Sequence, residues 1–462
     1  MLAMLLQADN RKDSADTRCR CRPMSRSRTI TLIVLAALCL PLVSGLLLSA
    51  KAQNKTPVAC LLSSPRATPA ICSQAKVKKT TVLVHKRLKQ CARMKAKKRR
   101  QACRATALRK LKQARKCAAV KIPKKTPKTT TTPAASPPPY GYSPAQIQHA
   151  YSLPSTAPAP QTIAIVSAYD DPTAEQDLGV YSTAYGLPAC TSANGCFTKV
   201  NGQGQPSPLP APDSLWALES SLDVQAVHAI CNNCKIILVE TSSDGVPGLA
   251  AGDDMAVTLG ANIVSNSWVA NEFSSETSLD SHFNHPGVAI TAATGDTGGH
   301  VVWPAASPYV TAVGGTTLDL DSTGTRTDEA AWGSSGSGCS LYETKPAWQT
   351  DTGCARRTIP DVSIDGDPDT GIAIYDSHGY SGRSGWFVVA GTSLGAPLIA
   401  GIYALAGNAS SVIAGSYPYS HTSSLFDIVT GSNGSCGTYL CNAGVGYDGP
   451  TGLGTPNGVS GF

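Results

Sequence analysis

The charges of this chain are unevenly placed: one region lacks acidic residues, and the region after it has few basic residues. Residues 53–128 contain no Asp or Glu against 24 Lys and Arg. Residues 129–462 are poor in basic residues, with seven Lys and Arg against 28 Asp and Glu. The formal net charge of +8 over 462 residues therefore hides a basic arm joined to an acidic body of net charge −21.

Long apolar runs are also rare in this sequence, and one lies near the N-terminus. Arg26 and Arg28 precede an apolar run over residues 30–48, and Ala50-Lys51-Ala52 follows it. This order is typical of a secretory signal peptide, so we expect residues 1–52 to be an N-terminal extension with a signal peptide and the protein to be secreted. The run is long enough to span a bilayer, so an uncleaved membrane anchor is the alternative. Once the signal is cleaved, we expect no association with the membrane.

The cysteines of the body fit an exported protein. They are eight in number and form four pairs that are close in sequence: Cys190/Cys196, Cys231/Cys234, Cys339/Cys354 and Cys436/Cys441. Local pairs of this kind favour short-loop disulfides in an oxidising compartment, although spacing does not prove connectivity. The Cys-x-x-Cys motif at 231–234 could instead be a redox or zinc element, but it lacks partner Cys or His residues at zinc spacing.

Residues 53–120 form a Lys/Arg-rich arm, which we expect to be partly helical or disordered. The stretch 84–119 has good helix formers and neither Pro nor Gly. The arm has an odd number of cysteines, which leaves at least one thiol free or paired between chains: Cys60, Cys72, Cys91, Cys103 and Cys117. Residues 121–142 are rich in Pro and Thr, and we expect them to form an extended linker.

Residues 143–462 have the pattern of one globular α/β domain. Nearly continuous apolar runs recur at 162–167, 235–240, 263–267, 288–292 and 309–313. Such runs are typical of strands that are buried on both faces. A helical stretch, 214–230, lies between the first two of them. The alternation predicts a parallel sheet with helices on both faces.

Ser393 is the first candidate catalytic residue. It lies in the small-residue segment Gly391–Pro397, ahead of a helix-like run at 398–406. A serine near a helix N-terminus is surrounded by free backbone N–H groups. That setting suits a nucleophile whose attack creates an oxyanion. The alternative is an ordinary N-cap serine.

A serine nucleophile needs a base, which in subtilisins is a histidine. No histidine of the body lies in a His-Gly-Thr motif at a strand end. His228 is nine residues beyond Glu219 on the predicted helix, so it faces roughly the opposite side, and we interpret it as structural. A histidine-based peptidase is therefore disfavoured.

Carboxyl groups are better placed than imidazoles. Glu219 and Asp223 are four residues apart, so they share one face of the predicted helix, and their neighbours are mostly apolar. Two carboxyl groups in an apolar setting can share a proton, and their pKa values then separate. The alternative is a pair of solvated surface acids.

Asp296 is a third candidate acid. It follows the apolar run at 288–292 and precedes Thr297-Gly298-Gly299. Ligands of α/β folds bind at the carboxyl ends of parallel strands. A protonated Asp at that edge can donate a hydrogen bond to an oxyanion, whereas a plain turn Asp before glycine is the alternative.

In combination, these motifs resemble the sedolisin, or serine-carboxyl peptidase, family. The resemblance covers about residues 140–462 and includes Ser143–Gln146, Glu219-x-x-x-Asp223, Gly295–Gly298, Trp303–Thr316 and the Ser393 segment. It implies a subtilisin-like fold and endopeptidase activity at acidic pH on protein or peptide substrates. It assigns Glu219 as the base, Asp223 as its carboxyl partner, Asp296 as the oxyanion donor and Ser393 as the nucleophile. Family members usually carry a large folded prodomain, to which the basic arm shows no resemblance.

The resemblance also implies one structural calcium ion in the C-terminal loops. Calcium takes carboxylate and backbone oxygens, and glycines allow carbonyl groups to turn inward. The positions that match the family's site are Asp427, Ile428, Gly444, Gly446 and Asp448. Without the resemblance, two acids among glycines would more simply be a loop.

These features predict a secreted, monomeric serine-carboxyl endopeptidase that forms an acyl-enzyme on Ser393. The alternative from a different class is a catalytically inert secreted binding protein whose basic arm grips an anionic surface polymer. We expect no specific nucleic-acid partner. The four catalytic residue types are all present, which favours the enzyme.

Overall fold

The computed structural model describes residues 141–462. The predicted signal region, the basic arm and nearly all of the linker lie outside the described residues. The expectations for them, and the domain boundaries at residues 52, 120 and 142, therefore stay predictions.

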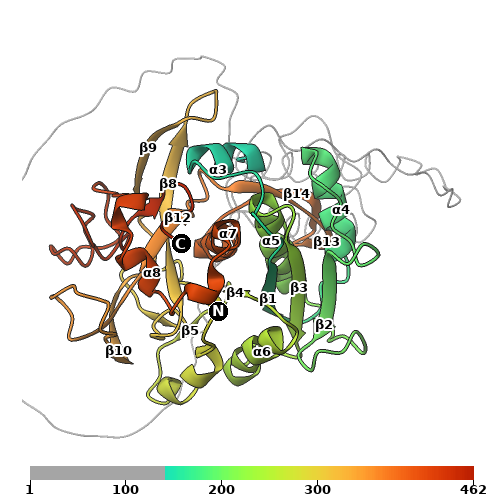
Figure 1. Ribbon diagram of the computed structural model, residues 1–462, viewed down its shortest axis with the longest axis horizontal. Helices are drawn as coiled ribbons and strands as arrows, with labels where there is room; N and C mark the ends of the chain where they lie inside the picture. Colours follow the sequence, from blue (N-terminus) through green and yellow to red (C-terminus); the bar gives the residue numbers. More distant parts are fainter. Residues whose placement is uncertain (1–140) are drawn as a thin grey trace, which may run out of the picture. The chain divides into compact units, whose positions relative to one another are not determined.

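The described chain alternates strands and helices in its first part and is richer in strands further on (Figure 1). The α-helices are α3 (Pro144–Ala150), α4 (Ala174–Tyr185), α5 (Ser214–Ile230), α6 (Val246–Thr258), α7 (Thr392–Ala406) and α8 (Ser416–Tyr419). The first strands are β1 (Thr162–Ala168), β2 (Phe197–Asn201), β3 (Lys235–Thr241), β4 (Ile263–Asn266), β5 (Ala270–Asn271), β6 (Ala289–Ala293), β7 (Val302–Trp303) and β8 (Thr311–Leu320). The later strands are β9 (Arg326–Ala331), β10 (Gly338–Thr344), β11 (Arg356–Ile359), β12 (Val362–Asp365), β13 (Ile372–Tyr380), β14 (Arg383–Val389), β15 (Leu425–Phe426) and β16 (Thr455–Pro456). Short 3-10 turns are η3 (Glu276–Ser278), η4 (Asp280–Phe283), η5 (Ala409–Ser411) and η6 (Thr422–Ser424).

The main sheet has eight strands and confirms the predicted parallel architecture. Seven strands run parallel in the order β12-β8-β6-β4-β1-β3-β2, and β9 pairs antiparallel with β8. All five apolar runs identified in the sequence lie in this sheet, as β1, β3, β4, β6 and β8. Strand β8 continues past the predicted end at Val313 to Leu320, because its second part pairs with β9.

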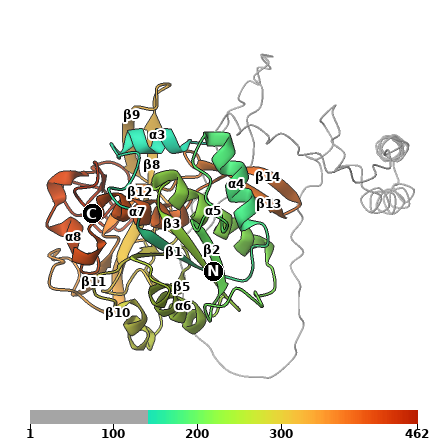
Figure 2. The same ribbon diagram turned by 45° about the vertical axis from the view of Figure 1, so that its right-hand side comes forward.

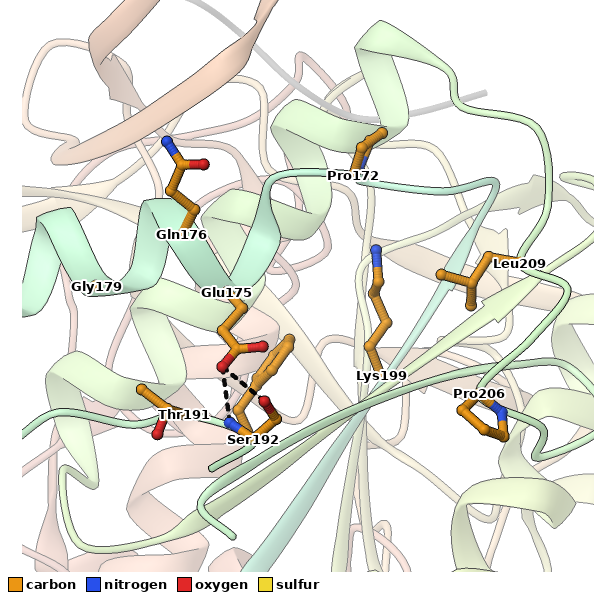
Figure 3. Close-up of a pocket in the computed structure, with 10 residues that line it drawn as sticks. Pro172, Glu175, Gln176, Gly179, Thr191, Ser192, Lys199, Pro206 and Leu209 are labelled. Atoms are coloured by element: carbon orange, nitrogen blue, oxygen red, sulfur yellow. Dashed lines mark hydrogen bonds between the residues drawn. The ribbon is translucent and has the colours of Figure 1, made fainter. Parts of the chain in front are cut away.

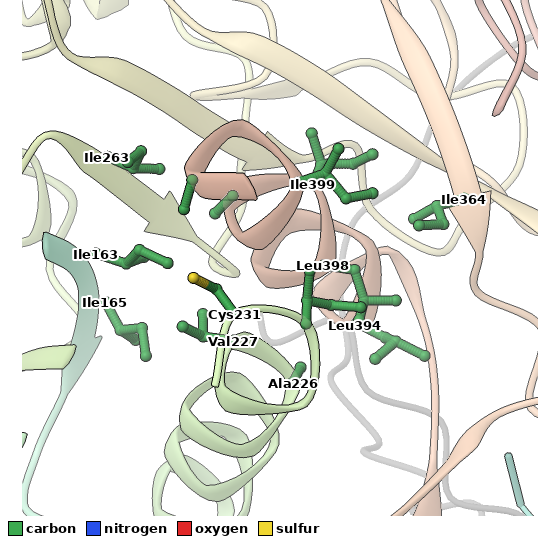
Figure 4. Packing of buried hydrophobic residues seen from close by; sticks show 14 of the residues in the cluster. Ile163, Ile165, Ala226, Val227, Cys231, Ile263, Ile364, Leu394, Leu398 and Ile399 are labelled. Carbon is green, nitrogen blue, oxygen red and sulfur yellow. The ribbon is translucent and has the colours of Figure 1, made fainter. Parts of the chain in front are cut away.

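Helices cover both faces of the sheet, so its strands alternate between two apolar cores. In β1, Ile163 and Ile165 point into the core formed with α5 and α7, whereas Ala164 and Val166 point into the core formed with α6. Figure 4 shows the first of these cores, where the strand residues meet Leu398 and Ile399 of α7 and Val227 of α5. Burial on both faces is the physical reason for the continuous apolar runs.

Helix α5 has the predicted bounds and is buried on every side. It begins after Asp213, whose carboxylate accepts hydrogen bonds from the backbone N–H groups of Leu215 and Trp216 at 2.9 and 3.2 Å. It packs on β1, β3 and α7 on its inner side and on α4 and β13 on its outer side (Figure 2). The Gln225 amide ties it to this outer layer through hydrogen bonds with the backbone of Tyr375 at 2.7 and 2.8 Å.

Helix α7 differs from the prediction, because it begins at Thr392 and not at Leu398. Gly391 precedes it with a φ of 100°, a conformation that favours glycine. Pro397 lies inside the helix, where its missing N–H leaves the carbonyl of Ser393 without its intrahelical partner. The Ser267 hydroxyl lies 3.0 Å from that carbonyl and 2.7 Å from Oδ1 of Asp223, so its single hydrogen is shared between two acceptors and compensates for the loss only in part.

The disulfide expectation for the body is confirmed. Cys190–Cys196, Cys231–Cys234, Cys339–Cys354 and Cys436–Cys441 are bonded. The Cys-x-x-Cys motif is therefore a disulfide at the end of α5. Among the helices of residues 141–462, none has the length and apolar character to cross a bilayer.

The contact between α5 and α7 gives a test of the packing. A Cβ atom added at Gly401 would lie 2.7 Å from Cβ of Ile230, whereas one added at Gly179 in α4 would meet nothing within 4 Å. Both changes to Ala gain helix propensity of about 1 kcal/mol, so only the packing differs. We expect Gly401→Ala to lower the midpoint of chemical denaturation and Gly179→Ala to leave it unchanged or raise it. Equal shifts for the two variants would contradict this packing.

Candidate active site

One surface pocket of the structure is not the candidate site. A cavity of about 640 Å³ lies between α4, β2 and the loop that leads to α5 (Figure 3). Glu175 and Lys199 line it, but the Glu175 carboxylate already binds Ser192 and Lys199 pairs with Asp170 at 2.5 Å. None of the four predicted catalytic side chains lines this cavity.

Three elements bring the predicted catalytic residues together. Glu219 and Asp223 come from α5, Ser393 from the first turn of α7, and Asp296 from the loop after β6. Helix α7 packs on α5 and on β4, β6 and β8. The acids of α5 and the loop after β6 therefore converge on the N-terminus of α7, at the carboxyl edge of the sheet.

Ser393 is fully buried, and the backbone of the β4 end holds its hydroxyl. Its Oγ donates to the carbonyl of Ser267 at 3.2 Å. The Ser267 hydroxyl lies 3.0 Å from the Ser393 carbonyl and 2.7 Å from Oδ1 of Asp223. Ser267 thus contacts both the nucleophile and one of the acids.

Glu219 and Asp223 are buried, so the alternative of two solvated acids is wrong. Each is 1 % exposed. Burial, followed by repulsion from Asp223, raises the pKa of Glu219 well above its ordinary value, while the nearby Ser393 hydroxyl opposes this. Burial likewise raises the pKa of Asp223, against the hydrogen bond from Ser267. Both acids therefore keep their protons to higher pH than solvated carboxyl groups do.

The Ser393 hydroxyl lies near both the Ser267 carbonyl and the base. Its Oγ is 3.2 Å from that carbonyl, and a hydrogen bond between the hydroxyl and Glu219 opposes the rise in the pKa of this acid. Proton transfer from Ser393 to Glu219 is therefore within reach, and catalytic hydrogen bonds often tighten only with substrate bound.

Asp296 is held by the start of α7. Its Oδ1 accepts hydrogen bonds from the Thr392 backbone N–H and from the Thr392 hydroxyl, both at 2.9 Å. Its Oδ2 is buried and has no partner among residues 141–462. Burial raises the pKa of Asp296 to about 7, although the bonds from Thr392 oppose this shift.

The histidine expectations agree with the structure. His228 is buried and hydrogen-bonds the Pro188 carbonyl at 2.9 Å, away from Glu219, and burial lowers its pKa. The groups that affect the pKa of Glu219 are Asp223, Ser393 and Asp296, with no imidazole among them.

The candidate calcium residues form a separate loop cluster. The Asp448 carboxylate accepts N–H groups of Gly444 and Thr451, and the Asp427 carboxylate accepts the N–H of Gly446 at 2.9 Å. Burial, with a contribution from Asp427, raises the pKa of Asp448 to about 6. In the part of the chain that the structure describes, no group of three or more His, Cys, Asp or Glu forms a metal site. A site here would rest on two carboxylates and on the carbonyls of Ile428, Gly444 and Gly446, an oxygen set that fits calcium.

Sequence analysis did not identify two residues of the site. Ser267 and Thr392 are both buried and bind the predicted acids directly. Pro397 carried a signal for Ser267, because a proline inside α7 leaves the Ser393 carbonyl in need of a donor. Thr392 carried no signal beyond its place beside Ser393.

No family model matches the chain. Comparison with curated proteins finds several relatives of the same kind. The chain is 29 % identical to sedolisin of Pseudomonas sp. (strain 101) over 368 residues, which is 68 % of this chain and 60 % of the relative. It is 29 % identical to kumamolisin of Bacillus sp. (strain MN-32) over 372 residues, covering 70 % and 63 %. Xanthomonalisin of Xanthomonas sp. (strain T-22) is 26 % identical over 352 residues, covering 60 % and 40 %.

A solved structure agrees with the sequence relatives. Pseudomonas sedolisin, a serine-carboxyl proteinase complexed with two molecules of pseudo-iodotyrostatin, matches with a TM-score of 0.58 and 26 % identity, covering 69 % of this chain and 95 % of that chain. The chain spans less than two thirds of the length of the curated relatives that it matches. The sequence relatives and the solved sedolisin structure, which has the same subtilisin-like fold, support the sedolisin family for this chain.

Proposed function

We propose that the body is a serine-carboxyl endopeptidase that hydrolyses peptide bonds of proteins at acidic pH. The observation that carries the proposal is the convergence of two buried carboxyl groups, Glu219 and Asp223, and the partly buried Asp296 on one buried serine at a helix N-terminus. The activity of the relatives supports it.

The proposed reaction begins with Ser393. Its Oγ attacks the substrate carbonyl carbon while its proton passes to Glu219, which Asp223 supports. The oxyanion receives a hydrogen bond from a protonated Asp296. Collapse of the tetrahedral intermediate releases the amine, which takes the proton from Glu219. Water then hydrolyses the acyl-enzyme by the same route, with Glu219 again as the base.

We predict an acidic optimum at about pH 3–5, the range in which carboxyl groups titrate. Asp296 must be protonated to donate to the oxyanion, and its pKa lies at about 7. Its acid form is lost as the pH rises through that value, so activity falls toward and above neutrality. At low pH, a second proton on the Glu219–Asp223 pair removes the base. A pH–rate profile on an unfolded protein substrate measures both limits.

Two variants make this profile interpretable. Ser393→Ala is the blank, and Glu219→Gln keeps the shape of the side chain but cannot accept a proton, so we expect it to lose about 100-fold or more in rate. An optimum at pH 8 that depends on Ser393 would mean that a histidine is the base. No activity sensitive to Ser393→Ala at any pH would favour the inert binding protein.

We also propose that the loop cluster of Asp427, Ile428, Gly444, Gly446 and Asp448 binds one structural calcium ion. A cation would offset the repulsion between the two carboxylates and stabilise the folded state by mass action. Chelation is expected to lower the melting temperature, and Asp448→Ala should abolish the effect of chelator. Asp321→Ala, at an exposed acid in the loop between β8 and β9, is the matched control. A melting temperature that is insensitive to chelator in the wild type would remove calcium from this account.

The basic arm of residues 53–120 is proposed to be dispensable for catalysis, and the protein to be secreted. The four disulfides of the body support export, and the arm has no apolar run long enough for a core of its own. We expect a chain that starts near Tyr140 to keep its peptidase activity. If only the longer chain folds and cleaves, the arm assists folding.

A further inference from the structure

The hydrogen atoms around Asp296 can be assigned from the donors and acceptors present. The Gly295 backbone N–H donates to Oγ1 of Thr392 at 2.9 Å. A backbone N–H can only donate, so the hydroxyl of Thr392 is the acceptor in that contact. Its own hydrogen is then available for Oδ1 of Asp296, which lies 2.9 Å away.

The same oxygen of Asp296 receives a second donor. The backbone N–H of Thr392 also points at Oδ1, at 2.9 Å. With two hydrogens directed at it, Oδ1 acts only as an acceptor, and a proton on this carboxyl group resides on Oδ2. Oδ2 is buried and has no partner among the described residues, so its proton is free for a substrate oxyanion.

We propose that Thr392 is a positioning residue that directs the proton of Asp296 to Oδ2 and, through its hydroxyl, sets the upper pH limit of the enzyme. The consequence for catalysis rests on the proposed function. The Thr392 hydroxyl has two opposing effects on catalysis by Asp296. It orients the acid, and it also stabilises the ionised form, in which the acid is useless as a donor.

The pKa of Asp296 results from two opposing effects. Burial raises its pKa, and the two bonds from Thr392 lower it without cancelling the shift. Glu219 on α5 is the charged group that faces Asp296 across the site. Residues 332–338, which lie against the Asp296 loop, and the first turns of α7 carry no titratable side chain. Thr392 is therefore the adjustable group, because its backbone N–H stays in every variant while its hydroxyl can be removed.

The direct test is the titration of Asp296 itself and needs no activity. The full chain is prepared with Ser393→Ala, to avoid self-cleavage, and with ¹³C-labelled Asp carboxyl groups. The Asp296 resonance is assigned by its loss in Asp296→Asn. Thr392→Val removes the hydroxyl at nearly constant volume, and we expect it to raise the titration midpoint by about one pH unit, as befits the loss of one hydrogen bond to a charged group. Thr392→Ser keeps the hydroxyl and should keep the midpoint.

The kinetic test uses the same changes in the active chain. Thr392→Val should move the alkaline limb of kcat/KM upward by a similar amount, so the variant outperforms the wild type above neutral pH. In an Asp296→Asn background, where the side chain cannot ionise, the same change should move no limb. A uniform loss at all pH values with an unmoved Asp296 midpoint would overturn the proposal and leave Thr392 a structural role. If the wild type shows no Ser393-dependent activity, the proposed function fails, and the Asp296 titration still decides the role of Thr392.

Discussion

Exclusion of water from carboxyl groups is the constraint on which the rest of this site depends. A carboxylate in water at neutral pH is charged, acts as a weak base and donates no hydrogen bond. Removed from water, the same group keeps its proton to higher pH. Glu219, Asp223 and Asp296 are all shifted in this direction, with burial as the largest cause in each case. One physical effect thus supplies both a pair of acids with raised pKa values and a carboxylic acid that can donate to an oxyanion.

A second layer of structure outside the sheet keeps α5, which carries two of these acids, inside the protein. Helix α5 would expose one side if it only covered β1 and β3. The β13–β14 hairpin and α4 close that side, and Gln225 joins the two layers by hydrogen bonds to Tyr375. The arrangement has a thermodynamic consequence. A carboxyl group with a raised pKa binds more protons in the folded state than in the unfolded state, so folding stability falls as the pH rises from its unfolded value near 4 to its folded value. For Asp296 that interval ends at about 7.

The sequence predicted the local parts of the fold well, because they depend on short-range patterns. The bounds of α5, the five central strands and the four cysteine pairs follow from apolar runs and close spacing, and the structure agrees with them. The shared face of Glu219 and Asp223 follows from their spacing alone. Their burial could not be predicted, since it depends on packing against α7 and on contacts with Ser267 and Ser393, which lie far away in the sequence. The start of α7 was misplaced because the small-residue segment up to Pro397 was not expected to be helical. Ser267, whose hydroxyl lies against the Ser393 carbonyl that Pro397 leaves unbonded, follows β4 and is far away in the sequence.

The residues that sequence analysis missed have one property in common, which explains why they matter. Ser267 and Thr392 have small neutral hydroxyl side chains. Each hydroxyl donates to one oxygen of an acid, and the other oxygen of that acid has no hydrogen-bond partner among the described residues. In both Asp223 and Asp296 the oxygen without a partner is Oδ2. Burial alone would make these acids protonated but would not say where the proton sits. A donor fixed on one oxygen decides that, at the cost of favouring the charged form. The site therefore needs burial strong enough to outweigh its own hydrogen bonds, and the raised pKa of Asp296 shows that in this protein burial prevails.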